Sequence, residues 1–376
     1  MFRKTYVQVN LENIKENIAR IGRNLPESCG IIAVVKANAY GHGAVWVSQA
    51  ALEAGACALA VALPEEAVEL REAGITCPIL VMTHANPEQL VVSCLLDLEQ
   101  GVSEPEDILF LNELAARENK KLNVHLKVDT GMGRIGIRSL EELHDMLEAF
   151  NNCPNICFKG VFTHFSCSDD ADNHYTRRQA EHFETYLAEI HAAGYKPEIH
   201  AANSASSIDM PQYAYDMVRL GISMYGYYPS QDMEKKVELL PAMEVVAEIS
   251  AVKTVPAGES IGYGATYKTD KETRVATVQI GYGDGYPRLL SNKGSMLVEN
   301  DGSAHEAPII GRVCMDQTMI DITGLHDIKI GDRAVVMGTL HDKCITAEDI
   351  AKWADTISYE IVLGFSSRVP RVHESE

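Results

Sequence analysis

Short apolar runs alternate with helix-like segments over roughly the first 230 residues of the chain. The runs are rich in valine, isoleucine, leucine and alanine, which is typical of strands buried on both faces of a parallel sheet. Between them lie segments with helical spacing, such as the helix expected to begin at Pro64. The expected strands are Ile31–Val35, Leu59–Leu63, Pro78–Met82, Glu99–Val102, Leu122–Val128, Phe158–Phe165, Glu198–Ala201 and Met217–Met224.

Eight strand–helix units predict an α/β fold with an N-terminal (β/α)8 barrel. In such a barrel the active site is built from residues at the carboxyl ends of the strands. Five polar or glycine residues follow, or end, expected strands and would therefore share one face: Lys36, Arg134, His164, Ser204 and Gly221.

The pattern changes after Tyr225, where prolines and glycines punctuate short β-rich runs. The charged segment Glu234–Lys236 reads as a linker, so we expect a barrel over residues 1–235 and a mostly β domain over residues 236–376. One helix, Thr346–Ala354, is expected in the second domain with Thr346 as its N-cap. The expected strands there include Ala247–Val252, Arg274–Ile280, Ser295–Val298, Met319–Ile322 and Ala334–Met337.

Composition narrows the class of protein. With 376 residues, 46% of them hydrophobic, the chain can bury the cores of two domains. Its formal net charge of -20 argues against nucleic acid and anionic membrane surfaces, because both attract basic proteins. We expect a small-molecule partner, with no nucleic acid and no membrane.

Sequence features also bear on location and metal content. No stretch approaches the roughly 20 apolar residues of a membrane span, and the segment Met1–Thr5 lacks the apolar core of a signal peptide. Nine cysteines occur without a C-x-x-C pair, which predicts reduced thiols and no metal site. The expected location is the cytoplasm.

Lys36 directly follows the apolar run Ile31–Val35. A desolvated lysine has a lowered pKa, and its neutral amine can form a Schiff base with a carbonyl cofactor such as pyridoxal phosphate. A surface lysine after a strand is the alternative, and spacing alone favours it. The residues themselves are more specific: the peptide from Val35 to Gly43, Val-Lys-Ala-Asn-Ala-Tyr-Gly-His-Gly, closely resembles the cofactor-lysine signature of the bacterial alanine racemases.

Further motifs extend this resemblance over most of the chain and into both expected domains. They are His125–Arg134, Thr163–Phe165, Ala202–Ala205, Val218–Ile222, Gly262–Tyr267 and Gly311–Asp316. The resemblance implies a fold-type III enzyme that uses pyridoxal 5'-phosphate to interconvert L-alanine and D-alanine, the latter for peptidoglycan.

Racemisation removes the α-proton from one face of a planar intermediate and returns it to the other, so two acid/base groups must oppose each other. The resemblance implies that these are Lys36 and Tyr263, with Tyr263 supplied by the partner subunit. It assigns His164 and Arg219 as cationic neighbours that ease deprotonation of the tyrosine. Arg219 would also face the pyridine nitrogen of the cofactor and leave it unprotonated, which favours proton return over transamination.

The remaining site residues follow from the same resemblance. Those implied for the cofactor phosphate are Tyr40, Ser204, Gly221, Ile222 and Tyr359. Those implied for the substrate are Arg134, which binds the carboxylate, Met315 of the partner subunit, and Tyr282 at the entrance. Lys127 matches a lysine that is carbamylated in many members and orients the arginine. We interpret His42, His200 and Asp316 as structural.

The implied assembly is a homodimer with shared active sites, because Lys36 lies in one expected domain and Tyr263 in the other. Three alternatives are open. One is a serine or broad-specificity amino-acid racemase of the same family. Another is a decarboxylase, which would need a catalytic cysteine for which Cys314 is the candidate. The third is a non-enzymatic pyridoxal-phosphate carrier, which would leave the second domain unexplained.

Overall fold

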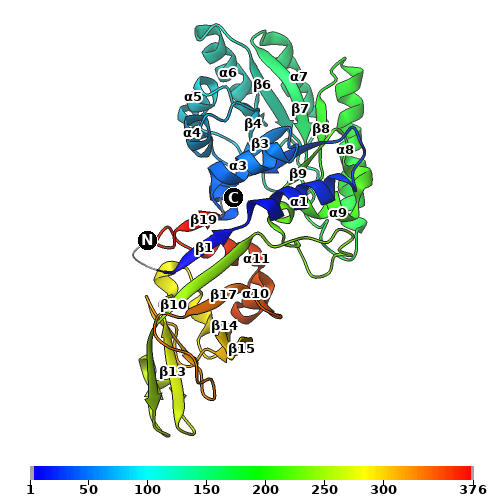
Figure 1. The fold of residues 1–376 in the computed structure, drawn as a ribbon. Helices are drawn as coiled ribbons and strands as arrows, with labels where there is room; N and C mark the ends of the chain where they lie inside the picture. The colour runs from blue at the N-terminus through cyan, green and yellow to red at the C-terminus, as the bar shows by residue number, and fades with distance from the viewer. Residues whose placement is uncertain (1–3, 374–376) are drawn as a thin grey trace. The chain divides into compact units, whose positions relative to one another are not determined.

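The computed structural model describes residues 4–373 of the chain. These residues form two compact units, which are described separately (Figure 1). One unit comprises Glu12–Ala39 and Gly43–Leu240. The other comprises the chain up to Leu11, the short segment Tyr40–His42, and the chain from Pro241.

The larger unit is the predicted barrel of eight parallel strands. Hydrogen bonds follow the order β8-β7-β6-β5-β4-β3-β2-β9. The two end strands are joined through Arg219 N–H to Ala202 O (2.9 Å) and Asp216 N–H to Ile199 O (3.0 Å), which nearly closes the barrel. The strands are β2 (Gly30–Val34), β3 (Ala58–Val61), β4 (Ile79–Val81), β5 (Glu99–Val102), β6 (Leu122–Lys127), β7 (Ile156–Phe162), β8 (Glu198–His200) and β9 (Met217–Leu220).

Helices connect and surround these strands (Figure 1). Three begin with proline at the first turn, where the missing N–H removes no helical hydrogen bond. The helices of this part of the chain are α1 (Leu11–Gly22), α2 (Lys36–Tyr40), α3 (Ala44–Glu53), α4 (Pro64–Glu72), α5 (Pro87–Leu95), α6 (Pro105–Arg117), α7 (Leu140–Asn152), α8 (His174–Ala192) and α9 (Ser204–Asp209), with the 3-10 turns η1 (Pro211–Tyr213) and η2 (Ile222–Tyr225).

Burial explains why the strands are apolar without alternation. Every residue of β3 and β4 is buried, because one face meets the barrel interior and the other meets the helices. A second layer of core lies between strands and helices, where Ile108, Leu143 and Phe183 are fully buried. The inner residues of each strand are therefore fixed in position, which in turn fixes the side chains at the strand ends.

Two expected strands of the barrel end well before their predicted boundaries. In the run Phe158–Phe165 the strand ends at Phe162, and in the run Met217–Met224 it ends at Leu220. The second ends because Gly221 adopts φ -102°, ψ -114°, which is not strand geometry, and the turn η2 follows. The apolar run continues past the end of the strand because the turn η2 is itself buried.

The smaller unit is a mostly β domain, as the sequence predicted. It includes β1 (Tyr6–Val9), which pairs antiparallel with β10 and parallel with β19, whereas the sequence analysis placed residues 1–235 in the barrel. The other strands are β10 (Met243–Val255), β11 (Ser260–Ile261), β12 (Tyr267–Lys268), β13 (Thr273–Val278), β14 (Ser295–Asn300), β15 (Ser303–Pro308), β16 (Thr318–Asp321), β17 (Arg333–Leu340), β18 (Lys343–Ile345) and β19 (Arg371–His373).

The helical parts of this unit are short. Helix α10 (Ala347–Ala354) has the predicted N-cap, since Thr346 Oγ1 accepts a hydrogen bond from Asp349 N–H (3.0 Å). A second helix, α11 (Ser358–Gly364), was not predicted; seven residues are too few for periodicity to identify it. The 3-10 turns are η3 (Tyr263–Ala265), η4 (Tyr282–Asp284) and η5 (Arg288–Leu290). None of the helices within residues 4–373 is long and apolar enough to span a bilayer.

Candidate active site

Lys36 lies two residues beyond β2, at the carboxyl end of the barrel. Burial lowers the pKa of its ammonium group, and the positive charges of Arg134 and Arg219 lower it further, while Glu66 opposes the change. A lysine with these neighbours holds its proton weakly, so its neutral amine is accessible for proton transfer or for a carbonyl compound.

The backbone after Lys36 makes a left-handed turn. Four consecutive residues that are not glycine, Ala37 through Tyr40, have φ between 51° and 53°. Such geometry is unfavourable for L-residues, and it persists where surrounding contacts hold it. Here the carboxylate of Glu66 accepts from Ala37 N–H (2.6 Å), and Asn38 Oδ1 accepts from Ala44 N–H (2.7 Å).

Arg219, on β9, is buried and its guanidinium is held by carbonyl groups. Nη1 donates to His200 O (2.8 Å), and Nη2 donates to Thr163 O (2.7 Å) and Ala201 O (3.0 Å). Nη1 also lies 2.9 Å from Nδ1 of His200, and Nη2 lies 3.3 Å from Nδ1 of His164. Burial, with a contribution from Arg134, lowers the pKa of Arg219 to about 9, so the group remains charged at neutral pH.

Lys127 and His164 stand beside this arginine at the ends of β6 and β7. Lys127 is buried, with Nζ 4.6 Å from the ring centroid of Phe162. Burial, followed by Arg219 and Arg134, brings the pKa of Lys127 well below its usual range. Burial and these same cations also hold the pKa of His164 well below its usual range. The charges of Arg219 and Arg134 therefore disfavour protonation of their neighbours, and the two arginines make this end of the barrel a cationic centre.

Ser204 and the turn after β9 make a compact group of donors. Ser204 Oγ accepts from Gly221 N–H (2.9 Å), from Ser223 N–H (3.3 Å) and from the Ser223 hydroxyl (3.0 Å). Asn203, which was not assigned a role, caps α9 by accepting from Ser206 N–H (3.2 Å). Clustered N–H and hydroxyl donors at the carboxyl end of a barrel suit a phosphate group. Ser223 was missed because a serine within an apolar run reads as core.

Arg134 belongs to a loop shaped by Asp129. The Asp129 carboxylate accepts from Gly131 N–H and Gly133 N–H (both 3.0 Å). Burial would raise the pKa of Asp129, but these hydrogen bonds outweigh it and the pKa is lowered. The exposed Arg134 side chain lines a pocket of about 520 Å³ that also contains His84 and Glu104.

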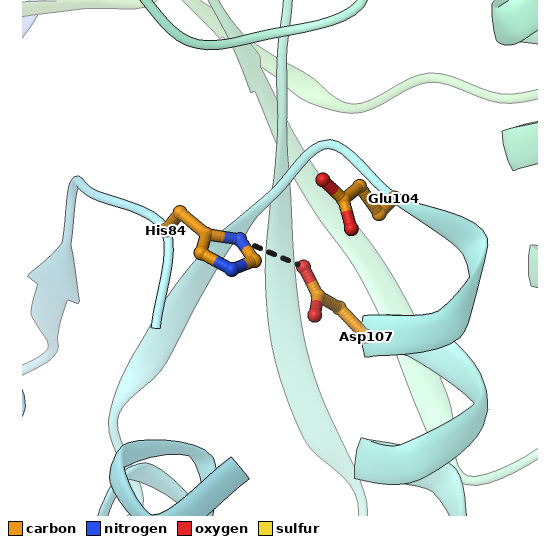
Figure 2. Close-up of side chains that lie close together, drawn as sticks. All are labelled: His84, Glu104 and Asp107. Carbon is orange, nitrogen blue, oxygen red and sulfur yellow. Dashed lines mark ion pairs between the residues drawn. The ribbon is translucent and has the colours of Figure 1, made fainter. Parts of the chain in front are cut away.

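Figure 2 shows three neighbouring side chains that were not predicted from the sequence, His84, Glu104 and Asp107, of which the first two line this pocket. Their ligand-type atoms lie within 4.8 Å of one another, and His84 Nδ1 is 3.5 Å from Asp107 Oδ2. Burial raises the pKa of Asp107 to about 6, and His84 opposes that shift. Glu104 and Asp107 occupy the N-cap and first turn of α6, where acidic residues favour a helix. We interpret the cluster as a helix start paired with a neighbouring histidine.

In the β unit, two tyrosines predicted to serve the cofactor lie close together. The ring centroids of Tyr40 and Tyr359 are 6.2 Å apart at an angle of 49°. Tyr40 is buried, and burial raises the pKa of its hydroxyl well above its usual range, so this hydroxyl is a neutral hydrogen-bonding group. Both residues thus belong to the unit that contains Tyr263.

Tyr263, Tyr282 and Met315 are exposed large side chains on adjoining loops of the β unit. Tyr282 N–H donates to Cys314 O (3.0 Å), which ties its turn to the segment that carries Met315. The turn of Tyr263 packs against Arg312, because a Cβ at Gly264 would lie 2.9 Å from Arg312 Nη1. Tyr263 is 72% exposed. Exposed aromatic and apolar side chains on neighbouring loops are typical of an interaction surface.

Comparison with known proteins covers the whole chain. The family model for the alanine racemase N-terminal domain matches residues 9–229, and that for the C-terminal domain matches residues 242–373. An alanine racemase of Halothermothrix orenii is 43% identical over 375 residues, covering 100% of this chain and 98% of that protein.

Solved structures agree with these matches. The crystal structure of an alanine racemase from Bacillus anthracis with bound L-Ala-P superposes with a TM-score of 0.93 at 37% identity, covering 100% of this chain and 96% of that chain. A histidine racemase from Leuconostoc mesenteroides has a TM-score of 0.91 at 28% identity and covers 100% and 99%.

Proposed function

The chain belongs to the alanine racemase family, and we propose that it interconverts L-alanine and D-alanine with pyridoxal 5'-phosphate as its cofactor. It is accordingly an isomerase. The relatives are named for alanine, so the broad-specificity alternative is not favoured. The single observation that carries the proposal is the arrangement at the carboxyl end of the barrel, where the charges of Arg219 and Arg134 lower the pKa of both Lys36 and Lys127. Such an arrangement suits an anionic cofactor and an anionic substrate.

The donors present fit pyridoxal phosphate. Gly221 N–H and the Ser223 hydroxyl converge on Ser204 Oγ, and we propose that these donors turn to the phosphate when it binds; Ile222 lies in the same turn. Tyr40 and Tyr359 offer two further hydroxyls. The Nη hydrogens of Arg219 are occupied by protein acceptors, which leaves Nε–H as the donor that would be available to the cofactor ring. When bound, the cofactor supplies the electron sink that makes the α-proton of the amino acid acidic.

Two bases move the proton in our proposal. Lys36, with its lowered pKa, accepts or returns the α-proton on one face of the substrate. Tyr263 of the partner subunit would serve the opposite face, with His164 and Arg219, which lie beside each other, as the neighbours that ease its deprotonation. Arg219 keeps its own proton at neutral pH, so it would not transfer one to the ring nitrogen of a bound cofactor, and this would restrain side reactions.

Substrate recognition rests on the carboxylate. Arg134 offers a fork that fits it, and the backbone at Met315 adds donors, while Tyr282 stands at the entrance. A charged Lys127 would be repelled by Arg134, and we propose that Lys127 is carbamylated instead. The lowered pKa of Lys127 keeps its amine neutral and able to react with carbon dioxide, and the resulting anion would orient Arg134.

We propose a homodimer whose active sites are shared. The exposed Tyr263, Tyr282 and Met315 form a surface that a second copy of the chain would cover. The proposed location is the cytoplasm, which agrees with nine cysteines that are all free. The proposed role is supply of D-alanine for peptidoglycan.

The first test combines an absorption spectrum of the purified protein with an L-alanine racemisation assay. We expect a visible band from the bound cofactor and formation of D-alanine. Lys36→Ala should lose both the band and racemisation. A Lys36→Ala protein that is yellow and active would contradict the assignment of this lysine.

A mixing experiment tests the shared site. Lys36→Ala and Tyr263→Phe subunits should each be inactive alone, since each lacks one base. Co-refolded subunits should regain about a quarter of the parent activity, because half of the dimers are hybrids and each hybrid has one site with both residues intact. If both bases came from one chain, neither site of a hybrid would be complete and activity would stay absent.

A further inference from the structure

A chain of four buried side chains crosses the barrel from Arg219 to Glu99. Arg219 Nη1 lies 2.9 Å from His200 Nδ1, and His200 Nε2 lies 2.9 Å from His125 Nδ1. His125 Nε2 lies 3.0 Å from Glu99 Oε2. Both histidines are at most 1% exposed. The chain spans β9, β8, β6 and β5, so it links strands that are distant in sequence.

A glycine makes this path possible. Strand β7 runs between β6 and β8, and Gly160 on β7 is the register partner of His125. A Cβ at Gly160 would lie 2.1 Å from His125 Nδ1, so a side chain at this position would block the contact with His200. Phe162 then holds the second ring, because it stacks on His200 with centroids 4.9 Å apart and planes 8° from parallel.

The direction of every hydrogen bond follows from the arginine. A guanidinium only donates, so Nδ1 of His200 must accept. Burial and the positive charge of Arg219 keep the pKa of His200 well below its usual range, so the ring is neutral and its proton sits on Nε2. This proton is donated to His125 Nδ1, which leaves the proton of His125 on Nε2 for Glu99. The carboxylate is the final acceptor.

Glu99 is suited to be the last acceptor in this chain of four side chains. It begins β5, at the opposite end of the barrel from Lys36, and it also accepts from Asn123 Nδ2 (3.0 Å). Burial would raise its pKa, but the hydrogen bonds from His125 and Asn123 oppose this, and the pKa is lowered. It lines a pocket of about 530 Å³ with Asn123 and Arg71. The carboxylate thus stays ionised and can only accept.

We propose that Glu99 and His125 are positioning residues that hold His200 in the tautomer able to accept from Arg219, and that they thereby fix the guanidinium toward the cofactor ring. This inference rests on the proposed function for its effect on the reaction. With the other tautomer, an N–H of His200 would face an N–H of Arg219 at 2.9 Å, and the guanidinium would have to turn away.

The structural part of the proposal can be tested without cofactor or substrate. Solid-state NMR of the full-length protein with ¹⁵N-labelled histidine should show His125 and His200 protonated at Nε2 alone. Glu99→Gln should preserve this state, because the amide oxygen still accepts from His125. Glu99→Leu should alter the resonances of both rings. A parent protein with His200 protonated at Nδ1 overturns the proposal, even if every variant fails to fold.

The functional part uses the cofactor-loaded enzyme. Glu99→Leu should lower kcat about tenfold with KM nearly unchanged, as expected when an outer partner of an active-site group is lost. It should also shift the visible band and raise the number of transamination events per turnover. Glu99→Gln should restore most of these values. The matched control is Asn123→Ala, which removes a partner of Glu99 that lies outside the chain of four.

The possible results separate the two proposals. If Nε2 protonation depends on Glu99 but the protein has no racemase activity, the proposed function is refuted and the positioning role stands. An active racemase in which Glu99→Leu leaves the band, kcat and transamination unchanged would refute the positioning role alone.

Discussion

The left-handed turn after Lys36 leads to a stability prediction of unusual sign. Ala37→Gly should stabilise the barrel unit, although glycine at an exposed position normally destabilises a fold. Ala37 has φ 52° and ψ 53°, and its side chain is exposed. Its backbone N–H keeps the bond to Glu66 in the variant, because that bond involves no side-chain atom of residue 37.

The magnitude follows from two opposing terms. An L-residue in the left-handed helical region costs about 1–2 kcal/mol, and glycine does not incur that cost. Glycine in turn gives the unfolded chain more conformational freedom, which lowers the free energy of unfolding by about 0.4–1 kcal/mol. Because the methyl group of Ala37 is exposed, little burial is lost. The net expectation is a gain of about 0.5–1 kcal/mol in the free energy of unfolding.

Urea denaturation can measure this, with Ala188→Gly as the matched control. Ala188 is an exposed alanine within the right-handed helix α8, where glycine costs about 1 kcal/mol. Ala37 and Ala188 lie in the same compact unit, so both variants report on one unfolding transition. The two midpoints should move in opposite directions at an unchanged slope.

Activity adds a second readout. The turn fixes the backbone next to Lys36, so the glycine variant should be more stable and less active, because a looser turn spreads the amine over more positions. If Ala37→Gly lowers the midpoint as Ala188→Gly does, the strain attributed to this turn is refuted.

Three other substitutions test particular contacts. Thr346→Ala should cost about 1 kcal/mol of stability, since it removes the acceptor for Asp349 N–H, and a thermal melt would detect it. Gly160→Ala should cost about 1–3 kcal/mol, because its Cβ would lie 2.1 Å from His125 Nδ1, and an unchanged denaturation midpoint would contradict that clash. The stability of the Asp107→Asn variant relative to the parent protein should increase as pH rises from 4 to 6.5. The pKa of Asp107 is raised from 3.8 to about 6, so the folded state holds its proton longer than the unfolded state and the parent loses stability across that window. The melting temperatures of parent and variant, measured over this pH range, should differ by a growing amount. A constant difference would refute the raised pKa of Asp107.

The barrel was predictable because its strands are buried on both faces. A run such as Ile31–Val35 is recognisable without knowledge of its neighbours, and helix starts such as Pro64 carry local signals. Strand ends were less accurate, since buried residues continue past Leu220 into a turn whose backbone depends on Gly221. The membership of β1 in the β unit could not be read locally, because it depends on pairing with β10 and β19 far along the chain.

The candidate site was predictable where a residue follows a strand or lies in a distinctive peptide. Lys36, Arg219 and Ser204 meet that condition, and the structure places them at one end of the barrel. Residues that act through others were missed. Glu66 reads as an ordinary first-turn acid of α4, yet its carboxylate holds the turn after Lys36. His200 was interpreted as structural because a buried histidine alone gives no sign of its partners.

The acids near the site explain why its cations keep their charge available. Glu66 is bonded to backbone N–H groups of Ala37, Ala62 and Leu63 rather than to a cation. Asp129 is bonded to loop glycines and pairs at 3.7 Å with the exposed Arg138. Arg219 in turn bonds carbonyl oxygens, which are dipoles and leave its net charge intact. Because local carboxylates are occupied by the backbone, the positive potential at this end of the barrel is left for an anion that arrives from outside. A phosphate and a substrate carboxylate are two such anions, and the proposed carbamate on Lys127 would be a third.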